Sequence, residues 1–201
     1  MNAPSERAKP GRPAQFSRED VVLAAVAVLD AEGLEALTMR RIGAQLNVSA
    51  MALYRHLPNR QAVLAAIVDH LVAQTDTTMA PGVTWPLALH TLAGNYRRML
   101  LSHPNAVVLL ATHPVDIEIG THLVSDVLIL LMAEGITQQD ALTTIQSVMT
   151  FVLGHALAQA GTPPGSDEPT PAADAEFYDH WFTTGLDAFV TGFEQKLGSA
   201  N

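Results

Sequence analysis

The stretch LTMRRIGAQLNVSAMALYRHLPNRQAVL, residues 37–64, decides the fold of this chain. Thr38, Ser49 and Asn59 are residue types that favour the N-cap position, and each precedes apolar residues at helical spacing. Only two residues connect the first of these helices to the second. The stretch therefore predicts two short helices joined by a tight turn, followed by a longer helix.

A further helix is predicted before this stretch. Ser17 can cap it, Glu19 and Asp20 suit its positive N-terminal end, and Gly33 is a plausible end. We expect a compact three-helix domain over residues 16–62, joined to the rest of the chain by a linking helix over residues 59–78. Residues 1–15, which contain three prolines, are expected to form a flexible basic arm.

Two short helices joined by a tight turn are typical of a helix-turn-helix, whose second helix can enter the major groove of DNA. Arg40 could reach a guanine edge or a phosphate, and Met51 could contact a thymine methyl. Small side chains at Ala50 and Ala52 would let the helix approach closely. Any one of these residues could belong to an ordinary solvated helix, but their coincidence favours DNA binding. Phosphate contacts are expected from Thr38, Ser49, Tyr54, His56 and Arg60.

Charge is divided unevenly along the chain. Residues 1–60 hold eight basic against six acidic residues, a net +2, whereas residues 61–201 hold three basic against fourteen acidic, a net −11. A basic N-terminal region on an acidic body can face a polyanion while the body is repelled from it. This distribution supports DNA binding by the N-terminal domain.

The remainder, residues 63–201, is predicted to be a helical bundle that binds a ligand and dimerises. Glycine, proline and histidine-proline breaks separate helices expected at 84–102, 105–112, 116–134, 137–160 and 174–197. The fold class is therefore all-α. The longest apolar run, residues 127–133, is too short for a membrane span and the chain has no cysteine, so we expect a cytoplasmic protein.

Residues 17–70 resemble the DNA-binding module of the tetracycline-repressor (TetR) family of bacterial transcriptional regulators. The specific features are the Leu-Tyr-x-His pattern at 53–56 and the Asn-Arg pair at 59–60. The resemblance implies a homodimer that places its helix-turn-helix on a palindromic operator. It also implies that base readout relies on Arg40, Ala50, Met51 and Ala52, while the other residues named above contact the backbone.

The C-terminal part resembles the ligand-binding domain of the tetracycline repressors within this family, in segments 102–114, 133–142, 151–154 and 182–194. Those proteins carry a metal-coordinating His three residues before the Thr of a Leu-Gly-Thr-Arg-Pro turn, where this chain has Leu109. We therefore expect a small hydrophobic or aromatic effector, and no metal or cofactor. Each candidate could instead be a core residue or a hydrogen-bonded histidine. The candidates are Tyr96, Met99, Leu109, His113, His122, Phe151 and His155.

The last two long helices carry apolar residues on more than one stripe, which requires burial on two sides. One side is the core of the chain, and the other is expected to meet the same helices of a second copy. Glycines within these helices suggest a close helix crossing. The predicted dimer interface contains Ile145, Val148, Val152, Gly154, Phe182, Gly185, Phe189 and Gly192.

The sequence thus predicts a ligand-responsive repressor, with no catalytic residues. Two alternatives remain open. A ligand-dependent activator would have the same DNA-binding module. A helical-bundle metal enzyme could use His103, His113, Asp116, Glu118 and His122, but their spacing matches no metal-binding signature.

Overall fold

The computed structural model describes residues 16–160 and 174–198, and the predicted arm at 1–15 lies outside these ranges. The described elements are α-helices and one 3-10 turn, which confirms the all-α prediction. They are α1 (Arg18–Glu32), α2 (Met39–Gln45), α3 (Ala50–Leu53), α4 (Arg60–Ala73), α5 (Trp85–Ser102), η1 (Pro104–Ala106), α6 (Val107–Thr112), α7 (Ile117–Ala133), α8 (Gln138–Ala160) and α9 (Ala175–Gly198).

Three of the predicted N-caps form side-chain hydrogen bonds. Ser17 and Asp20 form a reciprocal capping box at α1, Thr38 accepts from the amide of Arg41, and Asn59 accepts from the amide of Ala62. Ser49 occupies the N-cap position of α3, but its side chain makes no capping bond there, so that part of the prediction is wrong. A helix of only four residues offers little for a cap to stabilise.

The linking helix is shorter than predicted. It ends at Ala73 instead of continuing to residue 78, with Gln74 at the C-cap. The amide of Thr75 turns back to the carbonyl of Val72, and the carboxylate of Asp76 accepts from the amide of Thr78 at 2.9 Å. These local bonds replace further helical turns, because an aspartate can close a turn with the backbone two residues later.

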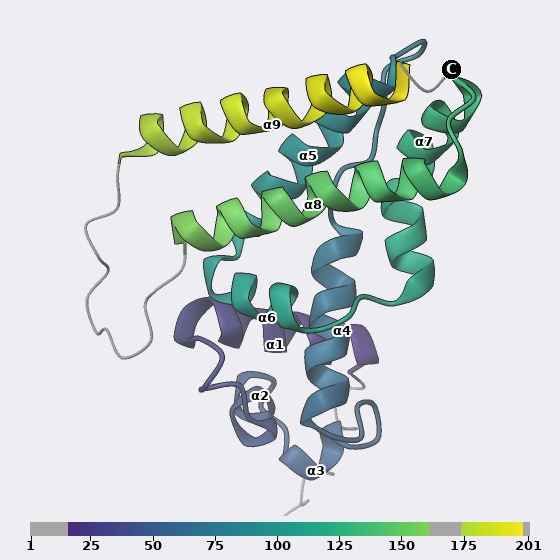
Figure 1. Cartoon of the computed structure of the whole chain (residues 1–201). Coiled ribbons are helices and arrows are strands. Elements are labelled where there is room, and N and C mark those ends of the chain that lie inside the picture. The colour runs from purple at the N-terminus through teal and green to yellow at the C-terminus, as the bar shows by residue number, and fades with distance from the viewer. Residues whose placement is uncertain (1–15, 161–173, 199–201) are drawn as a thin grey trace, which may run out of the picture.

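Figure 1 shows α1, α2 and α3 at one end of the molecule, α8 and α9 across the other, and α4 running between them. We call α1–α3 with the start of α4 the head, and α5–α9 the body. α8 packs against α5, α6, α7 and α9 and is the central helix of the body. It is long and apolar enough to cross a membrane by length and composition alone, a test that the core helix of a soluble protein also passes, and 44% of its most apolar window is buried in the structure.

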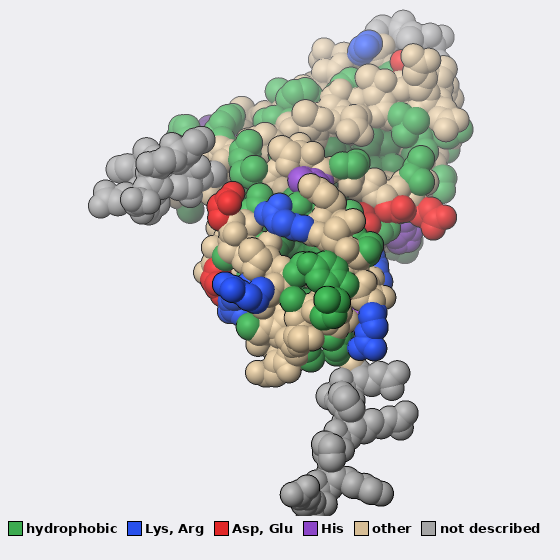
Figure 2. Space-filling view, turned by 90° about the horizontal axis from the view of Figure 1, so that it is seen from below, with side chains coloured by type: hydrophobic (Ala, Val, Ile, Leu, Met, Phe, Trp, Pro, Cys, Tyr) green, Lys and Arg blue, Asp and Glu red, His purple; other side chains and the backbone are tan. Residues whose placement is uncertain are grey.

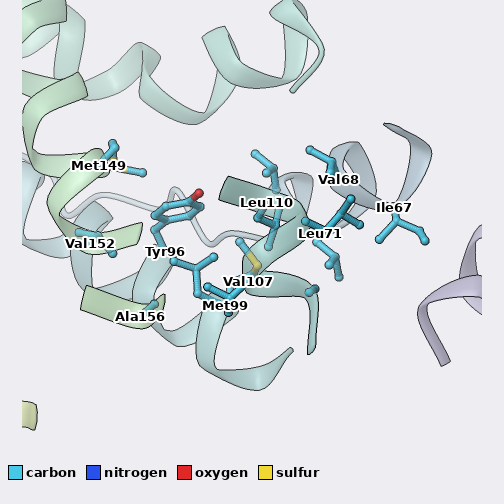
Figure 3. Packing of buried hydrophobic residues seen from close by; sticks show 14 of the residues in the cluster. Ile67, Val68, Leu71, Tyr96, Met99, Val107, Leu110, Met149, Val152 and Ala156 are labelled. Carbon is cyan, nitrogen blue, oxygen red and sulfur yellow. The ribbon is translucent and has the colours of Figure 1, made fainter. Parts of the chain in front are cut away.

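The body encloses a continuous apolar core. In Figure 3, Tyr96 and Met99 of α5 lie among Leu71 of α4, Leu110 of α6 and Val152 of α8, all of them buried. Core residues of the head belong to the same cluster. Apolar packing therefore continues from the head into the body through α4, whose inner face is buried at both ends.

Candidate functional site

α2 and α3 approach each other so closely that only glycine fits at position 43. A Cβ atom there would lie 2.8 Å from the carbonyl oxygen of Val48 and 3.2 Å from the amide nitrogen of Ala50. The Val48 amide donates to the Gly43 carbonyl at 2.9 Å, and Asn47 takes a left-handed φ of 56° to make the turn. This backbone contact fixes the orientation of α3 against α2.

The outer side of α3 exposes large side chains. Met51 is 75% exposed and Tyr54 is 44% exposed, whereas Leu53 and Leu57 of the same segment are buried beneath them. Figure 2 views this end of the molecule and shows a patch of apolar side chains with Lys and Arg around it. An exposed methionine and tyrosine on a helix this short are poorly explained by packing, because burial would stabilise both side chains.

The neighbours of these residues shape the same surface. Ala50 and Ala52 are half-buried, whereas Arg40 and Ser49 are exposed. The half-buried ring of His56 lies 4.9 Å from the ring of Phe16, between centroids. A role for Phe16 in holding His56 could not be found from helical spacing, since the two residues are forty positions apart.

Thr38 and Arg60 both make bonds inside the head. Thr38 caps α2, as described above. Arg60 donates from Nε to the carbonyl of Leu37 at 3.0 Å and from Nη2 to the carbonyl of Leu34 at 3.1 Å. These bonds attach the start of α4 to the loop between α1 and α2. The guanidinium of Arg60 therefore has a structural task that the sequence pattern did not reveal.

Neighbouring arginines on α2 have different environments. Arg41 donates from Nε to Glu32 of α1 at 2.8 Å, and this bond lowers the pKa of the Glu32 carboxyl below its usual value. It also donates from Nη1 to Gln45 at 3.1 Å. Arg41 is thereby held against α1, while Arg40 remains exposed.

Polar contacts join the body to the head and to α4. His103, which follows α5, lies 2.9 Å through Nδ1 from a carboxylate oxygen of Asp30 in α1. Asn105 of η1 donates to the carbonyl of Asp30 at 2.9 Å. The amide of Asp116 donates to Asp69 of α4 at 2.8 Å. A displacement of η1 or of the start of α7 would therefore act directly on α1 or α4.

The seven residues predicted to line one effector pocket lie in three places. Tyr96 and Met99 (Figure 3) are buried in the apolar core, as is Leu109, and burial raises the pKa of Tyr96 to about 12. Phe151 and His155 lie where α8 meets α9. His113 ends α6, and His122 is exposed on α7.

His155 is the centre of a cluster between α8 and α9. Its ring is 4.8 Å from the ring of Trp181 and 5.3 Å from that of Phe182, between centroids. Nε2 lies 3.1 Å from the carbonyl of Tyr178, whereas Nδ1 is buried without a hydrogen-bond partner. Burial lowers the pKa of His155, and the positive charge of Arg97 lowers it further. The cluster favours the neutral imidazole.

A groove lies between the end of α4 and the start of α7. Its volume is about 310 Å³, and its lining includes Val72, Thr75, Glu118, Ile119 and His122. His122 is thus the one member of the predicted effector set that lines this groove. Tyr96, Met99 and Leu109 fill the core from within, because apolar and aromatic side chains serve core packing as well as a pocket wall.

Comparison with known proteins follows the same division into head and body. The family model described as "Bacterial regulatory proteins, tetR family" matches residues 21–67, and the model described as "Tetracyclin repressor-like, C-terminal domain" matches residues 79–175. The chain belongs to the TetR family of transcriptional regulators. This confirms the resemblance found in the helix-turn-helix and in the C-terminal segments.

Individual relatives of this TetR-family chain are similar over most of their length. It is 29% identical over 202 residues to "Tetracycline repressor protein class D" of Escherichia coli, covering 92% of each chain. The structure of BioQ with its double-stranded DNA operator has a TM-score of 0.69 and 27% identity, over 89% of this chain and 98% of that one. Apo ActR from Streptomyces coelicolor shares the fold, with a TM-score of 0.80, 24% identity and coverage of 94% and 100%.

The tetracycline repressor of Escherichia coli and a further relative, the HTH-type transcriptional repressor DrrR1 of Streptomyces coeruleorubidus, are both named as repressors, so the chain is a regulator and not an enzyme. Within residues 16–160 and 174–198, no group of three or more histidine and acidic side chains is arranged to hold a metal ion. His103 and Asp116, two members of the alternative enzyme site, instead contact Asp30 of the head and Asp69 near the end of α4.

The predicted dimer residues of this TetR-family regulator divide into two groups. Ile145, Val148, Val152 and Phe182 are at most 7% exposed in the single chain, so they cannot offer surface to a second copy. A Cβ on Gly185 would lie 2.6 Å from the ring of Phe151, so this close helix approach is also internal. The prediction assigned these five residues to the wrong side, because an apolar stripe does not itself show which partner covers it.

A second stripe on the same helices remains uncovered in the single chain. Gly154 and Gly192 are exposed and have no atom within 4 Å of a would-be Cβ. The exposed large apolar side chains on α8 and α9 are Leu142, Leu157, Phe177, Trp181 and Phe189. Two-sided apolar helices were thus predicted correctly, although the outward stripe consists mostly of other residues.

Proposed function

We propose that this chain is a ligand-responsive transcriptional repressor that binds a palindromic operator as a homodimer and releases it when a small hydrophobic or aromatic effector binds. The observation that carries the proposal is the exposure of Met51 and Tyr54 on a helix fixed by the Gly43 contact. Arg40, exposed on α2, supplies a group able to read guanine or bind phosphate. Two relatives favour repression over activation. One is named a tetracycline repressor, and the structure of BioQ is described as a complex with its double-stranded DNA operator.

Homodimerisation would place two copies of α3 on the same side of the DNA. Heads about 34–36 Å apart would reach successive major grooves of a palindrome. The outward stripe of α8 and α9 supports this assembly, since Phe177, Trp181 and Phe189 are at least 38% exposed. Three exposed aromatic side chains on α9, beside the exposed Leu142 and Leu157 of α8, favour a protein partner. A cytoplasmic location follows from operator binding.

Effector control would act through α4. Its 14 residues make a rod about 21 Å long, so a pivot of about 10° moves its end by about 4 Å. A shift of that size separates α3 from its groove, because base contacts require hydrogen-bond distances. An effector that prefers the displaced state by about 2–3 kcal/mol would weaken operator binding by about 30- to 150-fold.

Operator binding tests the proposal. Footprinting of DNA upstream of the gene, followed by fluorescence anisotropy on the protected duplex, should give salt-dependent binding. Met51→Ala should weaken it about five-fold or more, whereas Met132→Ala, at an exposed methionine on α7, should not. Equal affinities for the two variants, or no protected site, would contradict the proposed role of α3.

A further inference from the structure

We propose that the groove between the end of α4 and the start of α7 binds a small organic cation, with an apolar or aromatic body and a protonated amine. This site was not assigned by the sequence, which placed the effector among buried residues of the core. The inference deepens the function proposed above, because its regulatory consequence rests on that function. The binding site itself can be tested without DNA.

An unsatisfied hydroxyl lies in the wall of the groove. Thr75 is 6% exposed, lines the groove, and has a buried Oγ1 without a hydrogen-bond partner. A buried hydroxyl without a partner costs about 1–3 kcal/mol, so a bound group that supplies the missing hydrogen bond recovers part of that cost. An N–H of an amine can donate to this oxygen.

Apolar side chains provide a surface for the body of the ligand. Val72 of α4 and both Ile119 and Leu123 of α7 line the groove. A second hollow of about 440 Å³ adjoins it along α7, shares Glu118 and His122, and includes Ile117, which is 81% exposed. An isoleucine so exposed beside a groove offers apolar area that a flat ligand would remove from water.

The charge around the groove favours a cation. Glu118 lines both hollows. Asp69 and Asp116 meet one helical turn before Val72, and Asp76 follows Thr75, with its pKa lowered by the hydrogen bond from the Thr78 amide. The basic side chains nearby are His122, which lines the groove, and Arg98, whose charge acts on Asp76. A carboxylate ligand would face repulsion from this wall, whereas an amine would be attracted.

The position of the groove connects binding to the head. Val72 and Ala73, which line it, belong to the last turn of α4. The first residue of α4, Arg60, holds the carbonyls of Leu34 and Leu37 in the head. A ligand that separates the last turn of α4 from α7 would therefore tilt the helix that positions α3. This is the displacement that the proposed repressor requires.

A matched pair of fluorescent probes tests the site. Dansylcadaverine carries an aromatic body and a protonated amine, and dansylglycine carries the same body and a carboxylate. The full-length protein should enhance the fluorescence of the amine saturably and bind it at least ten-fold more tightly than the acid. Glu118→Gln should weaken amine binding about five- to ten-fold, the loss expected for a hydrogen bond to a charged group. Glu134→Gln removes the same charge at the other end of α7 and should leave binding unchanged.

Thr75→Val provides a second, independent variant. It should weaken dansylcadaverine binding while leaving the thermal stability of the free protein unchanged or higher, because it removes an unsatisfied hydroxyl. Equal binding of both probes, or wild-type affinity in Glu118→Gln, would overturn the proposed site. Amine binding that leaves operator affinity unchanged would support the site and refute its regulatory role. If the ligand-free wild type does not bind operator DNA, the proposed repressor function is refuted, while the proposed amine site is not.

Discussion

Replacement of Gly43 by alanine tests the packing that orients α3. The new Cβ would lie 2.8 Å from the Val48 carbonyl oxygen and 3.2 Å from the Ala50 nitrogen. Both are backbone atoms, so no side chain can rotate away, and we take the upper end of the overpacking range, about 3 kcal/mol. Alanine gains about 1 kcal/mol over glycine within a helix. The expected net loss of stability is therefore about 2 kcal/mol.

Gly94→Ala is the matched control, since Gly94 lies inside α5 and a Cβ there would meet nothing within 4 Å. It should stabilise the protein by up to about 1 kcal/mol. Urea unfolding followed by circular dichroism, at one fixed protein concentration, should separate the two variants by about 3 kcal/mol. Gly43→Ala should also lose operator affinity. Equal stability of the two variants, with operator binding intact, would refute the close packing of α2 and α3.

Three further predictions concern the head, the body and the dimer. Arg60→Lys should lower the free energy of unfolding, measured in urea, by about 1–2 kcal/mol, because one ammonium cannot replace the hydrogen bonds to both carbonyls. A variant as stable as the wild type would contradict the structural role of Arg60. For His155, the folded pKa lies below the unfolded value, so stability should fall as the pH drops below about 6.5, where only the unfolded chain gains the proton. His155→Gln should reduce that fall between pH 7 and 5, and an unaltered pH dependence would count against it. Gly154→Glu should weaken the dimer about ten-fold or more in sedimentation equilibrium, since the single chain has open space for the new side chain and only a second copy would meet it. An unchanged dissociation constant would exclude the outward stripe as the dimer interface.

The helices of the N-terminal head could be predicted because the residues that begin and end them act locally. Ser17, Thr38 and Asn59 each cap the helix that follows, and the φ of 79° at Gly33 ends α1. These effects depend on neighbours within four residues, which the sequence displays directly. The end of α4 was missed because the bond from Thr78 to Asp76 competes with continued helix.

The site was less predictable, because its decisive contacts are distant in sequence. Arg60 binds carbonyls more than twenty residues away, and no spacing rule reveals a side chain bonded to a remote backbone. Apolar periodicity located two-sided helices but not which stripe meets the core, so Ile145 and Val148 were assigned outward although they are buried. The α4–α7 groove depends on how two helices diverge, which has no sequence pattern.

The central claim is that two copies of this TetR-family chain place paired α3 helices on one operator. Sedimentation velocity of the protein mixed with the footprinted duplex measures the number of chains on each duplex. We predict two chains per duplex, and loss of that complex for a duplex whose half-sites are moved apart by five base pairs, about half a helical turn. A complex with a single chain, or one that tolerates the altered spacing, would contradict the claim.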